Sequence, residues 1–378
     1  MIEDAHLLDE DNGSIYPIDI PRWRADTGAS LRVSDLPGIR RSAIDLGERS
    51  LWRYRDALPA NIRSCISLGE GCTPLIEKYF RGQRVKFKLE WFAPSGSFKD
   101  RGVSAMISLL HQQGVDEVVE DSSGNGGAAV AAYGAAAGMT VHILAPESTQ
   151  PAKIAQIRAY GARVRLIPGP REETEVAALE MAERVFYASH NWHPFFLQGT
   201  KTLGYELWED LGFRCPDNVI IPTGAGSNVL GCDLAFRELL AIGEIDHLPR
   251  LYVAQPANCA PVDAAFKAGA EDHVQCYFAP TIAEGTAIKR PLRMRRLLDA
   301  IRRSTGGTVA VSEGDIRDAA YELAASGLFV EPTSATAAAA FDKLIRDKVI
   351  KATEITVIVL SGGGLKASAF YQEMSGLK

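Results

Sequence analysis

Short apolar runs rich in β-branched residues alternate with helix-length segments from about residue 85 to the end of the chain. Such runs predict eight strands, at residues 85–89, 115–119, 141–144, 163–167, 218–221, 251–254, 308–311 and 356–360. Between them, helical patterns include residues 153–160, 172–185, 201–211, 316–325 and 335–346. Strands separated by helix-length crossovers form parallel sheets with helices on both faces, so the pattern predicts an α/β fold.

Composition and charge narrow the class of protein. The chain has 378 residues, of which 46% are hydrophobic and 23% charged, which is typical of a globular protein with a large core. The 41 Lys+Arg and 47 Asp+Glu residues give a formal charge of −6, which argues against a nucleic-acid partner. No stretch approaches the ~18 uninterrupted apolar residues of a membrane helix, and the acidic beginning does not resemble a signal peptide. We therefore expect a cytoplasmic protein with neither nucleic acid nor membrane as a partner.

Cysteine and histidine positions do not predict a metal site. The six cysteines are scattered, and no pair has the CxxC spacing of a zinc or redox motif. Free thiols in a reducing compartment are the expected state. His190 and His193 are spaced i, i+3, but acidic or thiol ligands are not close to them in the sequence. We interpret them as part of a polar loop and predict that the protein binds no metal.

Three glycine-rich segments lie between a predicted strand and the segment that follows it: residues 122–127 (SSGNGG), 223–228 (TGAGSN) and 361–364 (SGGG). In open parallel sheets, ligands bind at the carboxyl ends of the strands. Glycines let the backbone approach a ligand closely, and the first amides of a helix bind anions. Residues 223–228 therefore predict a phosphate site, although they match neither the dinucleotide nor the P-loop fingerprint. Glycines needed only for tight turns remain the alternative.

A lysine follows a polar turn in the segment PSGSFKDRG, residues 94–102. Lys99 would stand near the N-terminus of the next helix, where the macrodipole disfavours its ammonium form. The neutral amine is the nucleophile in Schiff-base chemistry, so Lys99 is a candidate for that role. The alternative is that Lys99, Asp100 and Arg101 form a solvated first turn.

Several motifs in order along the chain resemble those of the fold-type II pyridoxal-phosphate enzymes, and most closely threonine synthase and its relatives. The matching segments are GEGCTPL (69–75), KLE (88–90), SGSFKDRG (95–102), SSGNGGAAVAAYGAAAGM (122–139), GTKT (199–202), PTGAGSN (222–228), VEPTSA (330–335) and SGGG (361–364). The resemblance extends from about residue 50 to the C-terminus. Many motifs that occur in the same order along the chain indicate a family more specifically than any single motif does.

The resemblance implies that the cofactor is pyridoxal 5′-phosphate and that Lys99 binds it through a Schiff base and later moves protons. Asn125 would bind the 3′-oxygen of the ring, and Ser361 would face the pyridine nitrogen. A neutral hydroxyl there does not keep the nitrogen protonated, which suits elimination and replacement at Cβ or Cγ rather than transamination. The phosphate would be bound by Gly224, Ala225, Gly226, Ser227 and Asn228, and the amino-acid substrate by Ser97, Ser123, Gly124 and Asn125.

The resemblance also implies a domain organisation. Residues 51–100 and 195–378 would form a larger cofactor-binding domain, and residues 101–194 a smaller substrate-binding domain, with the cofactor in the cleft between them. The first 50 residues are rich in Asp and then interrupted by prolines, so we expect an irregular N-terminal extension. A homodimer is the expected assembly, as for most symmetric enzymes.

Three features depart from the threonine synthase pattern. Ala93 stands where many members carry Asn, with Ser95 in place of a Thr. Gly126 follows Asn125 where members carry a hydroxyl. Phe196 stands where an arginine is frequent, and an arginine would bind a substrate phosphate strongly. These changes are compatible with binding of the cofactor, but they leave the identity of the substrate open.

We therefore expect a pyridoxal-phosphate-dependent lyase of the threonine synthase type, which converts O-phosphohomoserine to threonine and phosphate by elimination and addition of water. An alternative is β-elimination or β-replacement on serine, threonine, an O-substituted serine or a diamino acid. Such an enzyme would be a dehydratase, an ammonia-lyase or similar to a cysteine or cysteate synthase. A third possibility is a non-catalytic relative that only binds the cofactor. A nucleotide-binding dehydrogenase is disfavoured because GxGxxG is missing.

Overall fold

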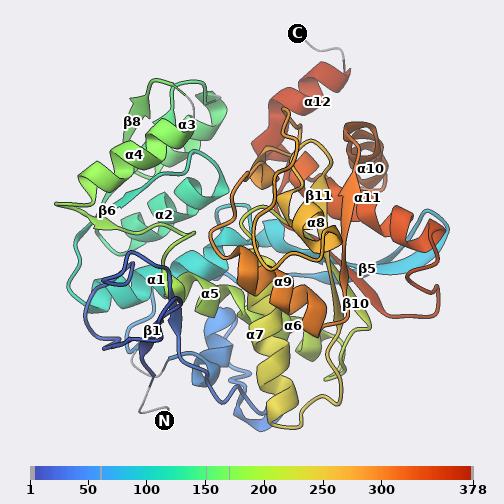
Figure 1. Ribbon diagram of the computed structural model, residues 1–378, viewed down its shortest axis with the longest axis horizontal. Coiled ribbons are helices and arrows are strands. Elements are labelled where there is room, and N and C mark those ends of the chain that lie inside the picture. The colour runs from blue at the N-terminus through green and yellow to red at the C-terminus, as the bar shows by residue number, and fades with distance from the viewer. Residues whose placement is uncertain (1–4, 60–61, 150, 170, 376–378) are drawn as a thin grey trace. The chain divides into compact units, whose positions relative to one another are not determined.

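The computed structural model describes residues 5–59, 62–149, 151–169 and 171–375 (Figure 1). The chain forms two compact units. The first unit comprises Met1–Cys72 and Ala93–Thr202, and the second unit comprises Thr73–Phe92 and Leu203–Lys378. The sequence-based domain limits, with residues 51–100 and 195–378 in one domain and residues 101–194 in the other, stay a prediction.

The second unit is built on a six-stranded sheet with strand order β12-β11-β10-β13-β5-β4. Neighbouring strands are parallel except for the hairpin of β4 and β5. That hairpin turns at Arg81 and Gly82, which both have positive φ and so suit the twist of the paired strands. The strands are β4 (Leu75–Phe80), β5 (Gln83–Leu89), β10 (Asn218–Pro222), β11 (Arg250–Pro256), β12 (Gly307–Val311) and β13 (Thr356–Leu360).

Helices cover this sheet, and α11 (Pro332–Arg346) packs against β10, β11, β12 and β13. Its first half is rich in buried alanine, which allows a close approach to the strands. The helix before it, α10 (Glu313–Ala325), begins with a capping box formed by Ser312 and Asp315. The other helices are α6 (Thr202–Asp210), α7 (Ser227–Ala241), α8 (Pro261–Lys267), α9 (Met294–Arg303) and α12 (Ser368–Ser375).

The first unit contains a four-stranded parallel sheet with strand order β8-β7-β6-β9. Its strands are β6 (Glu117–Glu120), β7 (Thr140–Pro146), β8 (Arg163–Ile167) and β9 (Phe186–Tyr187). Its helices are α1 (Lys99–Gln112), α2 (Asn125–Ala136), α3 (Pro151–Ala159), α4 (Arg171–Met181) and α5 (Pro194–Thr200). Helix α1 packs against both α2 and α5, and α2 packs on β7. Gly134 allows that approach, because a Cβ atom there would lie 2.2 Å from Cγ2 of Val141.

The N-terminal residues contain more regular structure than the sequence predicts. A three-stranded antiparallel sheet is formed by β1 (Leu7–Asp9), β2 (Ile15–Tyr16) and β3 (Leu31–Val33). Its apolar residues form a small core with Leu109 of α1 and Phe195 of α5. Strands of two or three residues are too short to produce a periodic pattern, which explains why we expected an irregular extension.

The predicted α/β fold is confirmed. Each of the eight predicted strands overlaps a strand of the structure, and residues 163–167 and 356–360 agree at both ends. The five predicted helical segments are also present. Among the described residues, no helix is both long and apolar enough to cross a membrane.

Candidate active site

The turn before α1 is fixed by a buried carboxylate. Asp100 accepts a hydrogen bond from the backbone N–H of Ser95 at 2.6 Å and a second from the Ser95 hydroxyl. Gly96 supplies the positive φ of +87° that the turn requires. Asp100 and Arg101 are both fully buried, so the alternative of a solvated first turn is wrong. The fold instead holds Lys99 as the first residue of α1.

Aromatic rings surround the Lys99 side chain within the first unit. Its Nζ atom lies 4.6 Å from the ring centroid of Phe98 and 5.4 Å from that of Phe196. Phe196 is fully buried, and its ring covers Gly102, where a Cβ atom would lie only 2.5 Å away. Phe196 stands at the position where the threonine synthase pattern frequently has arginine. In this protein the position therefore carries an apolar side chain that is packed inside the unit.

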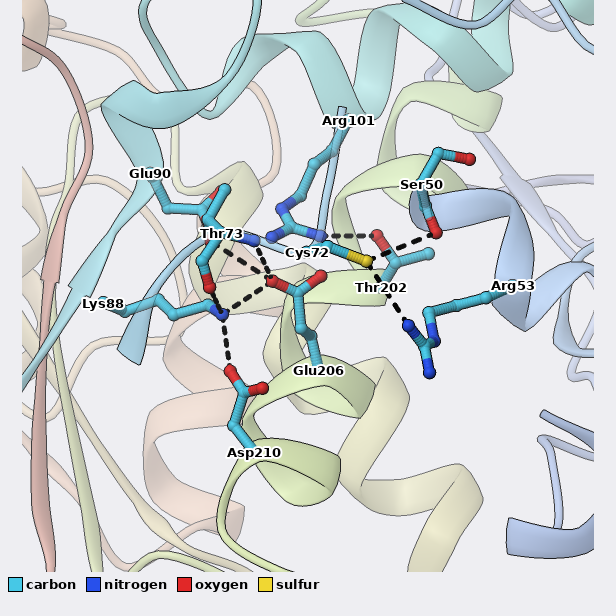
Figure 2. A network of polar contacts seen from close by, with 10 residues as sticks. All are labelled: Ser50, Arg53, Cys72, Thr73, Lys88, Glu90, Arg101, Thr202, Glu206 and Asp210. Atoms are coloured by element: carbon cyan, nitrogen blue, oxygen red, sulfur yellow. Dashed lines mark hydrogen bonds and ion pairs between the residues drawn. The ribbon is translucent and has the colours of Figure 1, made fainter. Parts of the chain in front are cut away.

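The helix pair α1 and α5 explains two of the sequence motifs in physical terms. Gly199 of the GTKT segment lies against α1, because a Cβ atom there would lie 2.0 Å from the carbonyl oxygen of Arg101. The Arg101 guanidinium donates to the Thr202 hydroxyl at 3.3 Å, which Figure 2 shows. These contacts join the segment that carries Lys99 to Gly199 near the end of α5 and to Thr202, which follows that helix.

The loop from β6 into α2 is tightly packed. A Cβ atom at Gly127 would lie 1.8 Å from the carbonyl oxygen of Ser122. A Cβ atom at Gly126 would lie 2.7 Å from two ring atoms of His190. The hydroxyl-bearing residue of related chains would not fit at position 126, because the histidine ring occupies that space. The departure from the family pattern thus has a steric reason.

A buried pair of side chains lies beside this loop. Glu120 ends β6, is fully buried and accepts the backbone N–H of His190 at 3.0 Å. Its Oε1 atom lies 2.8 Å from Nδ1 of His190. Burial raises the pKa of Glu120 to about 8. Burial, together with the charge of Lys99, lowers the pKa of His190 well below its usual range. Both shifts favour the uncharged form of the side chain concerned.

The sequence did not identify this pair. Glu120 ends an apolar run and belongs to no recognisable motif, and the sequence around His190 predicts only a polar loop. The neighbouring His193 has a simpler role, since it caps α5 and its Nδ1 atom accepts the N–H of Phe195 at 3.3 Å. The one available signal was an acidic residue at the end of a strand that precedes a glycine-rich loop.

In the second unit, the glycine loop (residues 223–228) connects β10 to α7. Gly226 has φ +89°, and a Cβ atom there would lie 2.3 Å from Cδ2 of Leu297. The first N–H groups of α7 have no partner within the helix. Both polar atoms of the buried Asn228 amide lack hydrogen-bond partners in the described part of the chain. Such unsatisfied donors at a helix N-terminus fit a phosphate group.

Ser361 follows β13, which is the parallel neighbour of β10. The carboxyl ends of the two strands therefore lie at the same edge of the sheet, as the glycine loop does. The Ser361 hydroxyl lies 3.3 Å from the hydroxyl of Ser334. Ser334 accepts the N–H of Gly362 at 2.8 Å and so holds this loop. The sequence singled out the VEPTSA motif but assigned no role to Ser334.

A buried ionic network lies inside the second unit (Figure 2). Lys88 is fully buried, and its Nζ atom lies 2.6 Å from Oε1 of Glu206 and 2.7 Å from Oδ2 of Asp210. It also donates to the carbonyl oxygen of Thr73 at 2.6 Å. The Thr73 hydroxyl donates to Glu90 at 2.6 Å. The KLE and GEGCTPL motifs thus meet in a charged network inside the second unit.

The predicted site residues fall into two sets. The first unit holds Ser97, Lys99, Ser123, Gly124 and Asn125, and the second holds Gly224, Ala225, Gly226, Ser227, Asn228 and Ser361. Within the first unit, His190 contacts both Phe196 and the start of α2 at Gly126, and Phe196 lies beside Lys99. Ser97 contributes a buried hydroxyl for which the described residues offer no hydrogen-bond partner. The roles of all these residues remain predictions.

Gly226 offers a test of the glycine loop. We expect Gly226→Ala to weaken binding of pyridoxal phosphate about tenfold or more, because alanine is strained at this φ and its methyl group meets Leu297. Titration of the apoenzyme with the cofactor measures the effect. Gly212→Ala is the matched control, since Gly212 has φ +68° with open space around it. Equal cofactor affinity in the two variants would contradict the assignment of the loop.

The comparisons with known proteins agree with this geometry. The profile of the family described as "Pyridoxal-phosphate dependent enzyme" matches residues 66–362. The parallel sheets, the lysine that opens α1 and the unsatisfied donors of the glycine loop are what such a cofactor requires. This chain belongs to the pyridoxal-phosphate-dependent enzymes, and its cofactor is pyridoxal phosphate. The family expected from the motifs is thereby confirmed.

Curated relatives point to one branch of the family. The threonine synthase of Methanocaldococcus jannaschii is 35% identical over 328 residues, which are 84% of this chain and 81% of the relative. The threonine synthase of Mycobacterium tuberculosis is 32% identical over 323 residues, 83% of this chain and 87% of the relative. The similarity therefore covers most of each protein.

Solved structures share the fold. Maize serine racemase is 25% identical, with a TM-score of 0.67 over 80% of this chain and 92% of the other. The L-serine ammonia-lyase of Rhizomucor miehei is 22% identical, with a TM-score of 0.71 over 82% of this chain and 99% of the other. The processed form of threonine deaminase isoform 2 from Solanum lycopersicum is 23% identical, with a TM-score of 0.69 over 91% of this chain and 97% of the other.

Proposed function

We propose that this enzyme is a threonine synthase, which converts O-phosphohomoserine and water to threonine and phosphate. The observation that carries the proposal is the 35% identity to the Methanocaldococcus jannaschii threonine synthase over 84% of the chain. When bound, pyridoxal phosphate supplies the electron sink for the carbanions of this reaction. The residues of the two sets then have to bind and orient the cofactor and the substrate, and to exchange protons with the substrate.

The two sets of residues would serve one cofactor. Lys99 would bind it covalently and, once released by the substrate, move protons at the substrate carbons. The Asn125 amide would orient the ring, and the first amides of α7 would bind the phosphate. Ser361, held by Ser334, would offer a neutral hydroxyl to the ring nitrogen. The unpartnered Ser97 hydroxyl would be available to a polar group of the amino-acid substrate, together with Ser123 and Gly124.

Phe196 supports a second candidate function. A buried phenylalanine cannot bind a phosphate group, whereas the arginine frequent at this position can form paired charge-assisted hydrogen bonds. A β-eliminating or β-replacing enzyme that acts on serine, threonine, an O-substituted serine or a diamino acid would not need that arginine. The fold is shared with enzymes described as a serine racemase and a threonine deaminase.

Product analysis distinguishes the two functions. Purified holoenzyme incubated with O-phosphohomoserine is expected to release phosphate and threonine in equal amounts. A panel of serine, threonine, an O-substituted serine and a diamino acid serves as the comparison. Ammonia or a β-substituted product from that panel, without phosphate release, would favour the second candidate. If no amino acid changed the absorbance of the bound cofactor, a non-catalytic relative would be the better description.

We also propose that the protein is cytoplasmic and forms a homodimer. Reduced thiols suit a reducing compartment, and none of the six cysteines, which all lie in the described residues, forms a disulfide. Two-fold symmetric dimers are the commonest assemblies of soluble enzymes. Sedimentation of the purified holoenzyme at micromolar concentration is expected to give a single species of twice the mass of the chain.

A further inference from the structure

The Glu120–His190 pair has no part in the proposed function. Both side chains are at least nine-tenths buried, and burying polar groups is costly unless they are hydrogen-bonded. The glutamate holds the histidine by two contacts, one to the backbone N–H and one to Nδ1. This arrangement fixes the ring in position and in orientation.

The histidine ring is placed at the first turn of α2. A Cβ atom at Gly126 would lie 2.7 Å from Cε1 and Nδ1 of His190, so ring and helix backbone are in direct contact. Gly126 directly follows Asn125, the residue expected to orient the cofactor ring. On its other side, the His190 ring packs edge-to-face on Phe196, with 5.6 Å between centroids. Phe196 in turn lies beside Lys99.

Charged groups approach the pair from several elements. Lys99 lies on α1, Asp121 directly follows β6, and Arg171 begins α4. Asp121 forms an ion pair with Arg171 at 3.6 Å and accepts a hydrogen bond from the Tyr187 hydroxyl of β9 at 2.9 Å. An uncharged His190 adds no positive charge beside Lys99.

We propose that His190, held by Glu120, is a positioning residue that sets the place of Asn125 at the start of α2 and thereby the fit of the cofactor ring. The sequence change at position 126 belongs to the same arrangement, because only glycine leaves room for the ring. The inference depends on the cofactor but not on which amino acid the enzyme transforms. Absence of phosphate release would therefore leave it standing.

Variants of the two residues test the proposal. His190→Ala removes the ring, whereas His190→Asn keeps a polar amide near the place of Nδ1, and Glu120→Gln keeps both contacts as a neutral isostere. We expect His190→Ala to bind pyridoxal phosphate about tenfold more weakly, the equivalent of one lost hydrogen bond. We also expect it to shift the pH at which the bound cofactor changes its absorbance. His190→Asn and Glu120→Gln should remain close to the wild type in both measurements.

The chain offers a matched control and a second route. His142 pairs with Glu117 at 2.7 Å on the same sheet, but Glu117 begins β6 whereas Glu120 ends it. His142→Ala is expected to leave cofactor affinity and absorbance unchanged. Gly126→Ala keeps His190 but pushes its ring, and it should reproduce the spectral shift even if His190→Ala fails to fold.

Three results would overturn the proposal. The first is a His190→Ala variant with a lower melting temperature but the cofactor affinity and absorbance titration of the wild type, which would indicate a purely structural role. The second is a Gly126→Ala variant without any spectral change. The third is that His190→Asn and Glu120→Gln bind the cofactor as weakly as His190→Ala does. This would contradict the proposal because these two variants preserve the hydrogen bond.

Discussion

Lys99→Ala is expected to lower kcat by about 10³-fold or more, since the variant has no amine to bind the cofactor or to transfer protons. Lys99 opens α1 in a turn that buried Asp100 fixes, so removal of the side chain should leave the fold intact. Reduction of the wild-type holoenzyme with borohydride, followed by peptide mass spectrometry, should place a pyridoxyl group on Lys99. The same treatment of the variant should yield no modified lysine.

Lys267→Ala provides the control for this experiment. Lys267 is an exposed lysine on α8 that pairs with Asp263 at 2.8 Å. Its removal should leave kcat and the site of borohydride reduction unchanged. A small amine added to Lys99→Ala should restore part of the activity, because it can replace the missing base. A variant that retained wild-type turnover, or a pyridoxyl group found on another lysine, would disprove the assignment.

The fold was largely predictable because its strands are buried. Strands of a parallel sheet that are covered on both faces appear as continuous apolar runs, as at residues 218–222 and 356–360. The missed strand β4 has the sequence LIEKYF, and Phe80 alone of its six residues is buried, so it shows no such run. The two-residue strand β9 is equally invisible, because its length is set by pairing with β6 rather than by its own sequence.

The candidate site was predictable where backbone geometry demands particular residues. A glycine at positive φ before α7, or a lysine after a tight polar turn, leaves a local signature in the sequence. Partners that meet only through the tertiary fold leave none. Glu120 and His190 are 70 residues apart, and Lys88 and Glu206 are 118 apart. Even the glycine at 126 appeared as an unexplained departure until the structure placed His190 against it.

Substitution of Lys88 is expected to cause a large loss of stability in the second unit. Its ammonium group is fully buried and bonded to Thr73, Glu206 and Asp210. Lys88→Met keeps the apolar stem but removes the ammonium group that bonds to the buried Glu206 carboxylate. Removing one partner of a buried ion pair destabilises proteins by about 3–5 kcal/mol, so we expect a loss of that size in the free energy of unfolding by urea.

Two further variants separate the buried charge from a general packing effect. Lys88→Met combined with Glu206→Gln should recover part of the lost stability, because the neutral amide removes the buried negative charge that Lys88 balanced. Lys86→Met, on the same strand, removes a partly exposed partner of Glu77 and should change stability little, as exposed pairs contribute little. Equal losses for Lys86→Met and Lys88→Met would show that the hairpin, and not the ionic network, determines the effect. A double variant that is no more stable than Lys88→Met would show that lost packing around the methionine causes the loss of stability. A double variant that is more stable than Lys88→Met would identify the buried charge of Glu206 as the cause.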